Sequence, residues 1–201
     1  MHVIPFNINI AMKFFQTFYL THFSKPISYR AIYRHIQSEH PRKVLEIGIQ
    51  RAERTRIMLQ LLLQYCGEKS DVHYCCIDPF ESRTPIDGPG LSLRKAHRII
   101  SPFGIQSRLI PSTPESAVWQ LHLNRLIEKV DLAIIATPDL TWLTTSMASL
   151  RELIHESAGI FVGLPTSENA GVYAFEKIGF SDLEFIVAQD GLLPQRIRQA
   201  A

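Results

Sequence analysis

The sequence predicts an α/β fold whose sheet is mostly parallel and ends in an antiparallel hairpin. From Lys43 onward, short apolar runs alternate with helical patterns, which is typical of parallel strands covered by helices on both faces. The run VHYCCI at 72–77 is almost continuously apolar, as in a strand buried on both sides. Near the C-terminus, Asp190-Gly191 lies between two apolar runs, and this dipeptide is a strong hairpin signal.

The first forty residues show a helical pattern without strands and form a predicted N-terminal flank, residues 1–40. Two helices are expected in it, at 11–23 and 29–38. The second ends before Pro41, because a proline pushes the preceding residue out of the α region. Residues 41–201 then form the α/β domain.

Seven strands are predicted in that domain, five of them parallel and two in the hairpin. The strands are expected at 43–47, 72–77, 107–110, 130–136, 158–163, 183–189 and 192–197. The helices are expected at 55–64, 92–100, 114–127, 143–155 and 172–178. No linker rich in Gly or Ser divides the chain, so it reads as one core with a flank.

Composition argues against several classes of protein, among them nucleic-acid-binding, membrane-spanning, disulfide-rich and zinc-binding proteins. The chain has 201 residues, 46% of them apolar, and a formal net charge of only +2, so no strong field attracts nucleic acid or anionic lipid. No apolar run approaches the ~20 residues of a membrane span, and no signal peptide is evident. Cys66, Cys75 and Cys76 match neither a disulfide framework nor a zinc site. We expect a cytoplasmic protein with reduced thiols, without nucleic-acid or membrane partners.

The turn after the first strand carries the first candidate site residues. In a doubly wound sheet the ligand lies beyond the carboxyl ends of the strands, beside strand one. Gly48 allows a close approach to a ligand, and Glu46 can accept hydrogen bonds from an amino or hydroxyl group. The helix from Thr55 aims its free amides at the same crevice. A plain strand-to-helix turn is the alternative interpretation.

Asp78 follows the next strand, in CIDPFE. An acidic residue at this place can accept both hydroxyls of a ribose that lies along strand one. Asp78 and Pro79 could instead simply begin a turn. Two acidic residues at the ends of consecutive strands strengthen the ligand-binding hypothesis.

The order of strand, Glu46-Ile-Gly48, helix, strand and Asp78 resembles the class I S-adenosylmethionine-dependent methyltransferase family. EIGIQRAERT and IDPFE are most similar to the small-molecule O-methyltransferase-like branch, which reads roughly EIGxxxGxST and IDP. The resemblance implies a Rossmann-like sandwich and S-adenosylmethionine as cofactor. It implies that the cofactor-binding residues are Glu46, Gly48, Ile49 and Gln50 at the methionine end, Asp78 at the ribose, Pro79, Phe80, Ser112 and Thr113 around the adenine, and Ala136 after the fourth strand.

The chain departs from the family pattern at three places. Gln50 and Ala52 stand where many members have glycine, and we expect the Ala52 methyl to crowd the cofactor carboxylate. The acid that usually ends the fourth strand is replaced by Ala136-Thr137, with Asp139 three positions on. We therefore expect no metal. Asp139 is a catalytic candidate, as is His97, a candidate general base whose alternative role is that of a solvated helix residue.

Two functions remain open. The first is an S-adenosylmethionine-dependent methyltransferase that acts on a small molecule. The alternative is a catalytically inactive relative that works as a binding or scaffold protein. A nicotinamide-dependent oxidoreductase is disfavoured because the GxGxxG spacing is absent. The sequence does not fix the oligomeric state, so a homodimer is compatible with it.

Overall fold

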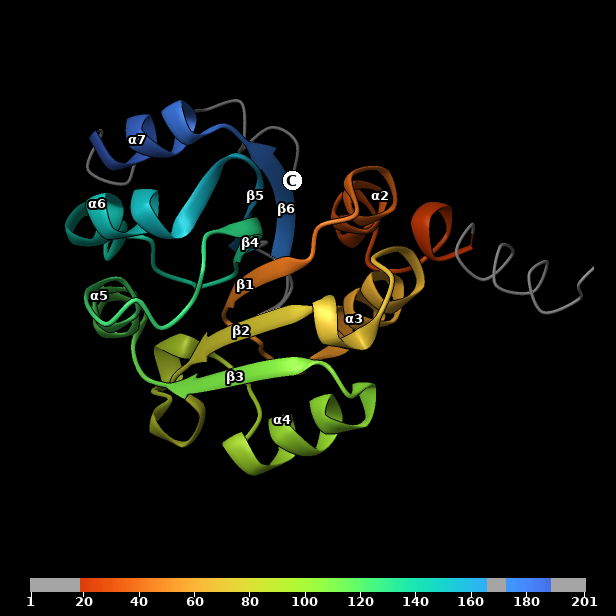
Figure 1. The fold of residues 1–201 in the computed structure, drawn as a ribbon. Coiled ribbons are helices and arrows are strands. Elements are labelled where there is room, and N and C mark those ends of the chain that lie inside the picture. The colour runs from red at the N-terminus through yellow and green to blue at the C-terminus, as the bar shows by residue number, and fades with distance from the viewer. Residues whose placement is uncertain (1–18, 166–172, 189–201) are drawn as a thin grey trace, which may run out of the picture.

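The computed structural model describes residues 19–165 and 173–188. They form three layers, with a central sheet between two layers of helices (Figure 1). Residues 19–22 are helical and precede the flank helix α2. The elements are α2 (Tyr29–Glu39), β1 (Lys43–Ile47), α3 (Glu53–Tyr65), β2 (His73–Asp78), α4 (Leu93–Ile100), β3 (Gln106–Pro111), α5 (Pro114–Leu123), β4 (Val130–Ile135), α6 (Leu143–Leu153), β5 (Ile154–Pro165), β6 (Tyr173–Ile178) and α7 (Phe180–Ala188).

The strand order is β3-β2-β1-β4-β5-β6. The first five strands in the sequence run parallel, and β6 pairs antiparallel with β5. From β1, the strands β2 and β3 extend the sheet to one side, and β4, β5 and β6 extend it to the other. The strand order therefore reverses between β1 and β4. Ligands of such sheets bind outside the carboxyl ends of the strands at this reversal.

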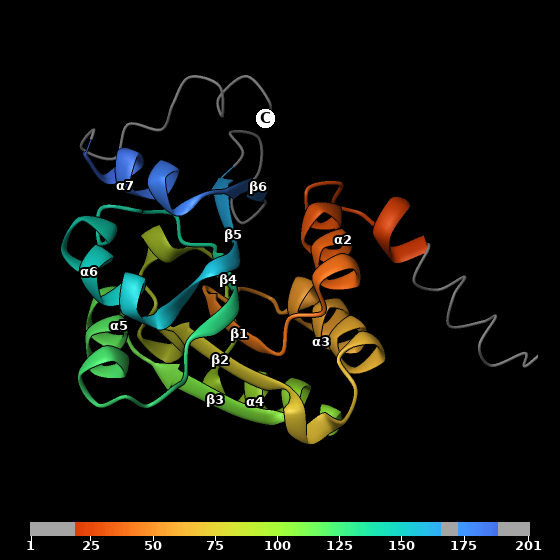
Figure 2. The same cartoon turned by 45° about the horizontal axis from the view of Figure 1, so that its top comes forward.

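The two faces of the sheet carry separate apolar cores. Helices α2, α3 and α4 cover one face, and α5, α6 and α7 cover the other (Figures 1 and 2). Along β4, Leu132 and Ile134 pack in the first core, while Ala133 and Ile135 pack in the second. This alternation explains the continuous apolar runs, because both faces of a central strand are buried.

The fold class is confirmed, but the strand count of seven is wrong, since the described residues form six. The predicted helix at 172–178 is the strand β6, in which Tyr173 and Phe175 are buried while Glu176 is exposed. The predicted strand at 183–189 falls in α7, which runs to Ala188. The antiparallel pair is therefore β5 with β6. The Asp190-Gly191 turn and the 192–197 strand lie outside the described residues.

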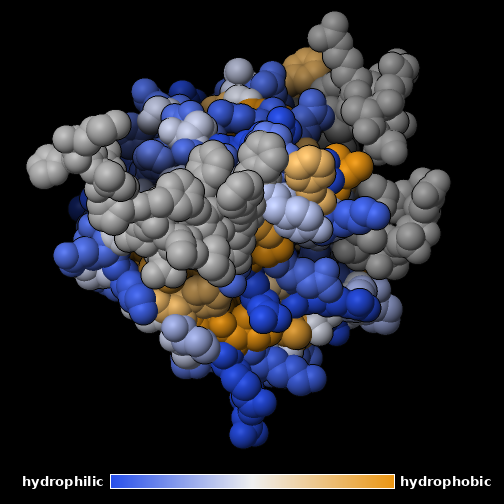
Figure 3. All heavy atoms as spheres, turned by 90° about the vertical axis from the view of Figure 1, so that its right-hand side faces the viewer, coloured by the Kyte–Doolittle hydropathy of each residue, from blue (hydrophilic) through white to orange (hydrophobic). Residues whose placement is uncertain are grey.

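The three cysteines are free and buried in the core. Burial raises the pKa of the Cys66 thiol to about 11 and that of Cys75 to about 12, so both are protonated at neutral pH. Among the described residues no helix is long and apolar enough to cross a membrane. Hydrophilic side chains predominate on the side that carries α2 and α3, with apolar ones showing between them (Figure 3).

Candidate functional site

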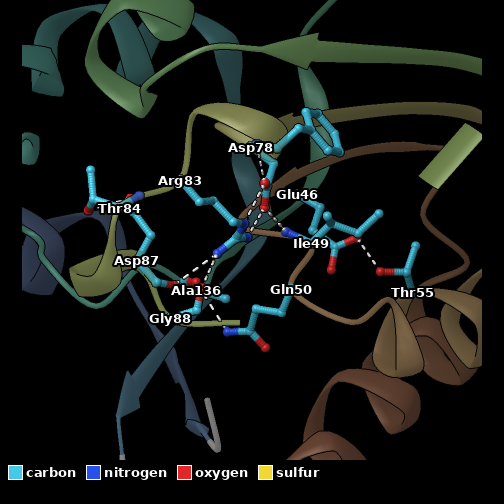
Figure 4. A network of polar contacts seen from close by, with 12 residues as sticks. Glu46, Ile49, Gln50, Thr55, Asp78, Arg83, Thr84, Asp87, Gly88 and Ala136 are labelled. Atoms are coloured by element: carbon cyan, nitrogen blue, oxygen red, sulfur yellow. Dashed lines mark hydrogen bonds and ion pairs between the residues drawn. The ribbon is translucent and has the colours of Figure 1, made fainter. Parts of the chain in front are cut away.

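Two buried carboxylates lie on neighbouring strands at the carboxyl edge of the sheet. Glu46 is the fourth residue of β1, Asp78 ends β2, and both are fully buried. The strands pair in parallel, with Glu46 opposite Cys76. Parallel pairing brings both carboxylates to the turn that follows β1 (Figure 4). This is the place where the sequence predicts a ligand.

Gly48 fixes that turn between β2 and β4. Its amide donates to the Ile77 carbonyl at 2.8 Å, and its φ of +90° lies in the region that favours glycine. A Cβ at this position would lie 2.3 Å from the carbonyl oxygen of Ala136. Glycine is therefore required by the close approach of β4, whatever the turn binds.

Gln50 and Ala52 adopt the left-handed backbone conformation that favours glycine, although neither is glycine. Their φ values are +56° and +59°, where an L residue loses roughly 1–2 kcal/mol. The Gln50 amide nitrogen donates to the Ala136 carbonyl at 3.3 Å, which ties the turn to β4. Ala52 immediately precedes α3, and its methyl is buried in the core under this helix. The two departures from the family pattern thus change the side chains of the turn while the left-handed backbone stays.

Glu46 is held by an internal ion pair with Arg54. The guanidinium donates to Glu46 Oε1, from Nε at 2.9 Å and also from Nη2. On the other oxygen, Thr55 Oγ1 donates at 2.9 Å and the Tyr74 hydroxyl at 2.5 Å. Arg54 also donates to the Gly48 carbonyl at 2.9 Å. Glu46 therefore joins β1, β2 and α3 to one another.

Arg54 is buried beneath aromatic rings. Its side chain is 2% exposed, and its guanidinium carbon lies 4.7 Å from the ring centroid of Phe175 and 5.7 Å from that of Tyr29. Burial lowers the pKa of Arg54, but the charge and hydrogen bonds of Glu46 outweigh burial and raise it. Arg54 stays charged, and its Nη1 has no hydrogen-bond partner among the described residues.

Asp78 accepts four hydrogen bonds. The amide of Phe80 donates to Oδ1 at 2.8 Å and that of Ile49 to Oδ2 at 3.0 Å. Arg83 donates a hydrogen bond from Nε to Oδ1 at 3.1 Å and another from Nη2 to Oδ2. A carboxylate offers about four acceptor positions, so the Asp78 carboxylate is saturated within the chain.

The other predicted cofactor-binding residues surround this edge in different ways. Ile49 is buried, and so is Ala136 just beyond β4. Phe80 is buried in the core, and Pro79 before it is half-buried. Ser112 donates its amide to the Asp78 carbonyl at 3.2 Å, and the exposed Thr113 precedes α5.

The two catalytic candidates have partners of their own. His97 is exposed on α4, and its Nδ1 lies 2.9 Å from the hydroxyl of Ser101. Asp139 is exposed and accepts the amide and hydroxyl of Thr141 at 2.9 and 2.7 Å, as in an Asx turn. The structure places neither in the network around the two buried carboxylates. Within the described residues, no three acidic, histidine or cysteine side chains could hold a metal ion together.

The sequence did not predict the two arginines, Arg54 and Arg83, that form ion pairs with the buried carboxylates. One signal was available for Arg54, because the pattern EIGxxxGxST has serine at that position. No local signal marks Arg83, whose contact with Asp78 depends on how the following loop folds. Tyr173 was missed because its segment was assigned to a helix. The ring of Tyr173 lies 6.3 Å from that of Phe175, which covers the Arg54 guanidinium, so Tyr173 lies beside the same site.

No family model matches the sequence, and no curated protein matches it. Among solved structures, the chain resembles the TDP-rhamnose 3′-O-methyltransferase of calicheamicin biosynthesis, with a TM-score of 0.53 and 13% identity over 89% of this chain and 97% of that one. It also resembles a hypothetical protein from Thermus thermophilus, with a TM-score of 0.51 and 13% identity over 78% of this chain and 87% of that one. The chain therefore has a Rossmann-like α/β fold, as the sequence predicts, and shares it with this O-methyltransferase.

Proposed function

We propose that this protein binds S-adenosylmethionine at the carboxyl edge of β1 and β2 and transfers its methyl group to a small molecule. The observation that carries the proposal is the buried Asp78 carboxylate beside the Gly48 turn, next to the point where the strand order reverses. Ribose-binding acids of doubly wound folds occupy this place. The shared fold of a sugar O-methyltransferase supports the same interpretation.

Each residue then has a specific role. Asp78 would accept the ribose hydroxyls, and the Gly48 turn would let the methionine part approach the backbone. The first amides of α3, which the side chain of the preceding Ala52 does not cap, would face the cofactor carboxylate. Glu46 would act through Arg54 and Thr55 to hold α3 in place, without touching the cofactor.

Methyl transfer makes modest demands on the protein. The cofactor supplies an activated methyl group, and alignment of the acceptor in line with it contributes most of the acceleration. Neither His97 nor Asp139 is held towards the two carboxylates, so we propose an acceptor that is nucleophilic without a strong general base. This chain's residues would orient the cofactor and exclude water from the reacting atoms.

A second function has specific support. Both carboxylates already form ion pairs with arginines of the same chain, Glu46 with Arg54 and Asp78 with Arg83. A protein that keeps the fold as a scaffold and no longer binds the cofactor would show such pairs. The two functions differ in whether Asp78 exchanges its internal partner for a ligand.

Calorimetric titration with S-adenosylmethionine separates the two functions. We expect a dissociation constant in the micromolar range, and at least tenfold weaker binding in Asp78→Asn. Arg151→Gln, which removes an exposed ion pair with Glu184, is the control that should bind as the unchanged protein does. Absence of binding in a correctly folded protein would favour the scaffold. Binding without methyl transfer to any of a broad set of small-molecule acceptors would contradict the enzymatic half of the proposal.

A further inference from the structure

Arg83 occupies on Asp78 the two positions that a ribose would need. Each carboxylate oxygen accepts one backbone amide, from Phe80 or from Ile49, and one nitrogen of Arg83. If Arg83 leaves, one acceptor position opens on each oxygen while both amides remain. Two hydroxyls on adjacent carbons fill such a pair of positions, as the two nitrogens of the guanidinium do now.

Residues of the same loop hold the Arg83 side chain in its position. Arg83 Nη1 donates to the Asp87 carbonyl at 2.8 Å. A Cβ at Gly90 would lie 2.1 Å from Arg83 Nε, so glycine at residue 90 leaves room for the arginine in its present position. Thr84 and Asp87 hold the intervening turn through hydrogen bonds of 2.7 and 2.8 Å (Figure 4).

The same loop allows Arg83 to leave. The arginine belongs to neither a strand nor an α-helix but lies between two single 3₁₀ turns, Phe80–Ser82 and Pro85–Asp87. Its side chain is 11% exposed, so part of it already reaches the surface. Movement of this loop would disturb no strand pairing among the described residues, because Asp78 is the last residue of β2.

We propose that Arg83 competes with the ribose diol of the ligand for Asp78. The inference rests on the proposed cofactor site and adds how that site is regulated. A ligand with a vicinal diol recovers both hydrogen bonds that Arg83 gives up. A ligand with only one of the two hydroxyls recovers one and displaces Arg83 poorly.

The test compares ligands as well as variants. Calorimetry of Arg83→Met, Arg83→Lys and the control Arg151→Met would use S-adenosylhomocysteine, adenosine and adenine. We expect Arg83→Met to bind S-adenosylhomocysteine about tenfold or more tightly than the unchanged protein, because the competing charge-assisted pair is gone. Arg83→Lys keeps the charge but loses the two-point contact, so its affinity should be intermediate. The gain should appear for adenosine and not for adenine, which has no ribose to place on Asp78.

The outcomes that contradict the proposal are distinct. Equal affinity of Arg83→Met and the unchanged protein for S-adenosylhomocysteine would overturn the role of Arg83 and leave the cofactor site standing. An equal gain for adenine would show that the substitution only loosens the loop, which also overturns the proposal. No binding to any variant that unfolds cooperatively would overturn both this inference and the proposed function.

Discussion

The ends of β1 and β2 carry the same pair of groups, a buried carboxylate and an arginine, in two different settings. Arg54 belongs to the first turn of α3, is 2% exposed and lies under aromatic rings. Arg83 belongs to a loop and is 11% exposed. Glu46 is bound by side chains from two further residues, whereas Asp78 receives two backbone amides besides its arginine. We infer from the comparison that the Glu46 pair is a fixed part of the core and that the Asp78 pair is the exchangeable one.

The largest expected effect is on the fixed pair. Arg54→Met should lower the free energy of unfolding by about 3–5 kcal/mol, because a buried carboxylate loses its cation. Denaturant unfolding measures this loss. Glu46→Gln combined with Arg54→Met should recover a large part of it. A double variant no more stable than Arg54→Met would show that the packing of Arg54, and not its charge, matters.

The next largest loss of stability is expected when the hydrogen bond from the Tyr74 hydroxyl to Glu46 is removed. Tyr74→Phe should cost about 1.5–3 kcal/mol, the range for a hydrogen bond to a charged group. Burial raises the pKa of Tyr74 well above its ordinary value, so the hydroxyl stays a donor throughout the neutral range. The loss should therefore be the same at pH 6 and pH 8. A loss that changes between these pH values would contradict the assignment.

The matched substitution in the exchangeable pair should cost less. Arg83→Met is expected to lower the free energy of unfolding by about 1–2 kcal/mol, since Asp78 keeps two amide donors and Arg83 is partly exposed. The measurement is the same denaturant titration. A cost equal to that of Arg54→Met would mean that both pairs are structural, and the contrast between them would disappear.

The smallest effect is expected at Ala52, between the two pairs. Ala52→Gly relieves about 1–2 kcal/mol of left-handed strain, but it removes a buried methyl worth about 0.8 kcal/mol and loosens the unfolded chain. These contributions nearly cancel, so stability should change by less than about 0.5 kcal/mol. Because the methyl packs in the core, we expect unchanged affinity for S-adenosylhomocysteine. Tighter binding would instead support the crowding that the sequence suggested.

The parallel strands and both carboxylates could be predicted from the sequence because their signals are local. Buried strands are continuous apolar runs, and Glu46 and Asp78 stand at the ends of two of them. The arginine partners could not be predicted, since the cation that reaches a buried acid depends on the folded positions of α3 and the loop. The strand β6 was misassigned because a short apolar segment fits both periods. Its alternating burial at Tyr173 and Phe175 is visible only once β5 is beside it.

The most direct test is a crystal structure of the protein with S-adenosylhomocysteine. We expect both ribose hydroxyls to lie within hydrogen-bond distance of the Asp78 oxygens, Arg83 to have left them, and Arg54 to remain on Glu46. A ligand bound elsewhere, or one that separates Arg54 from Glu46 while Arg83 stays on Asp78, would contradict the division into a fixed and an exchangeable pair.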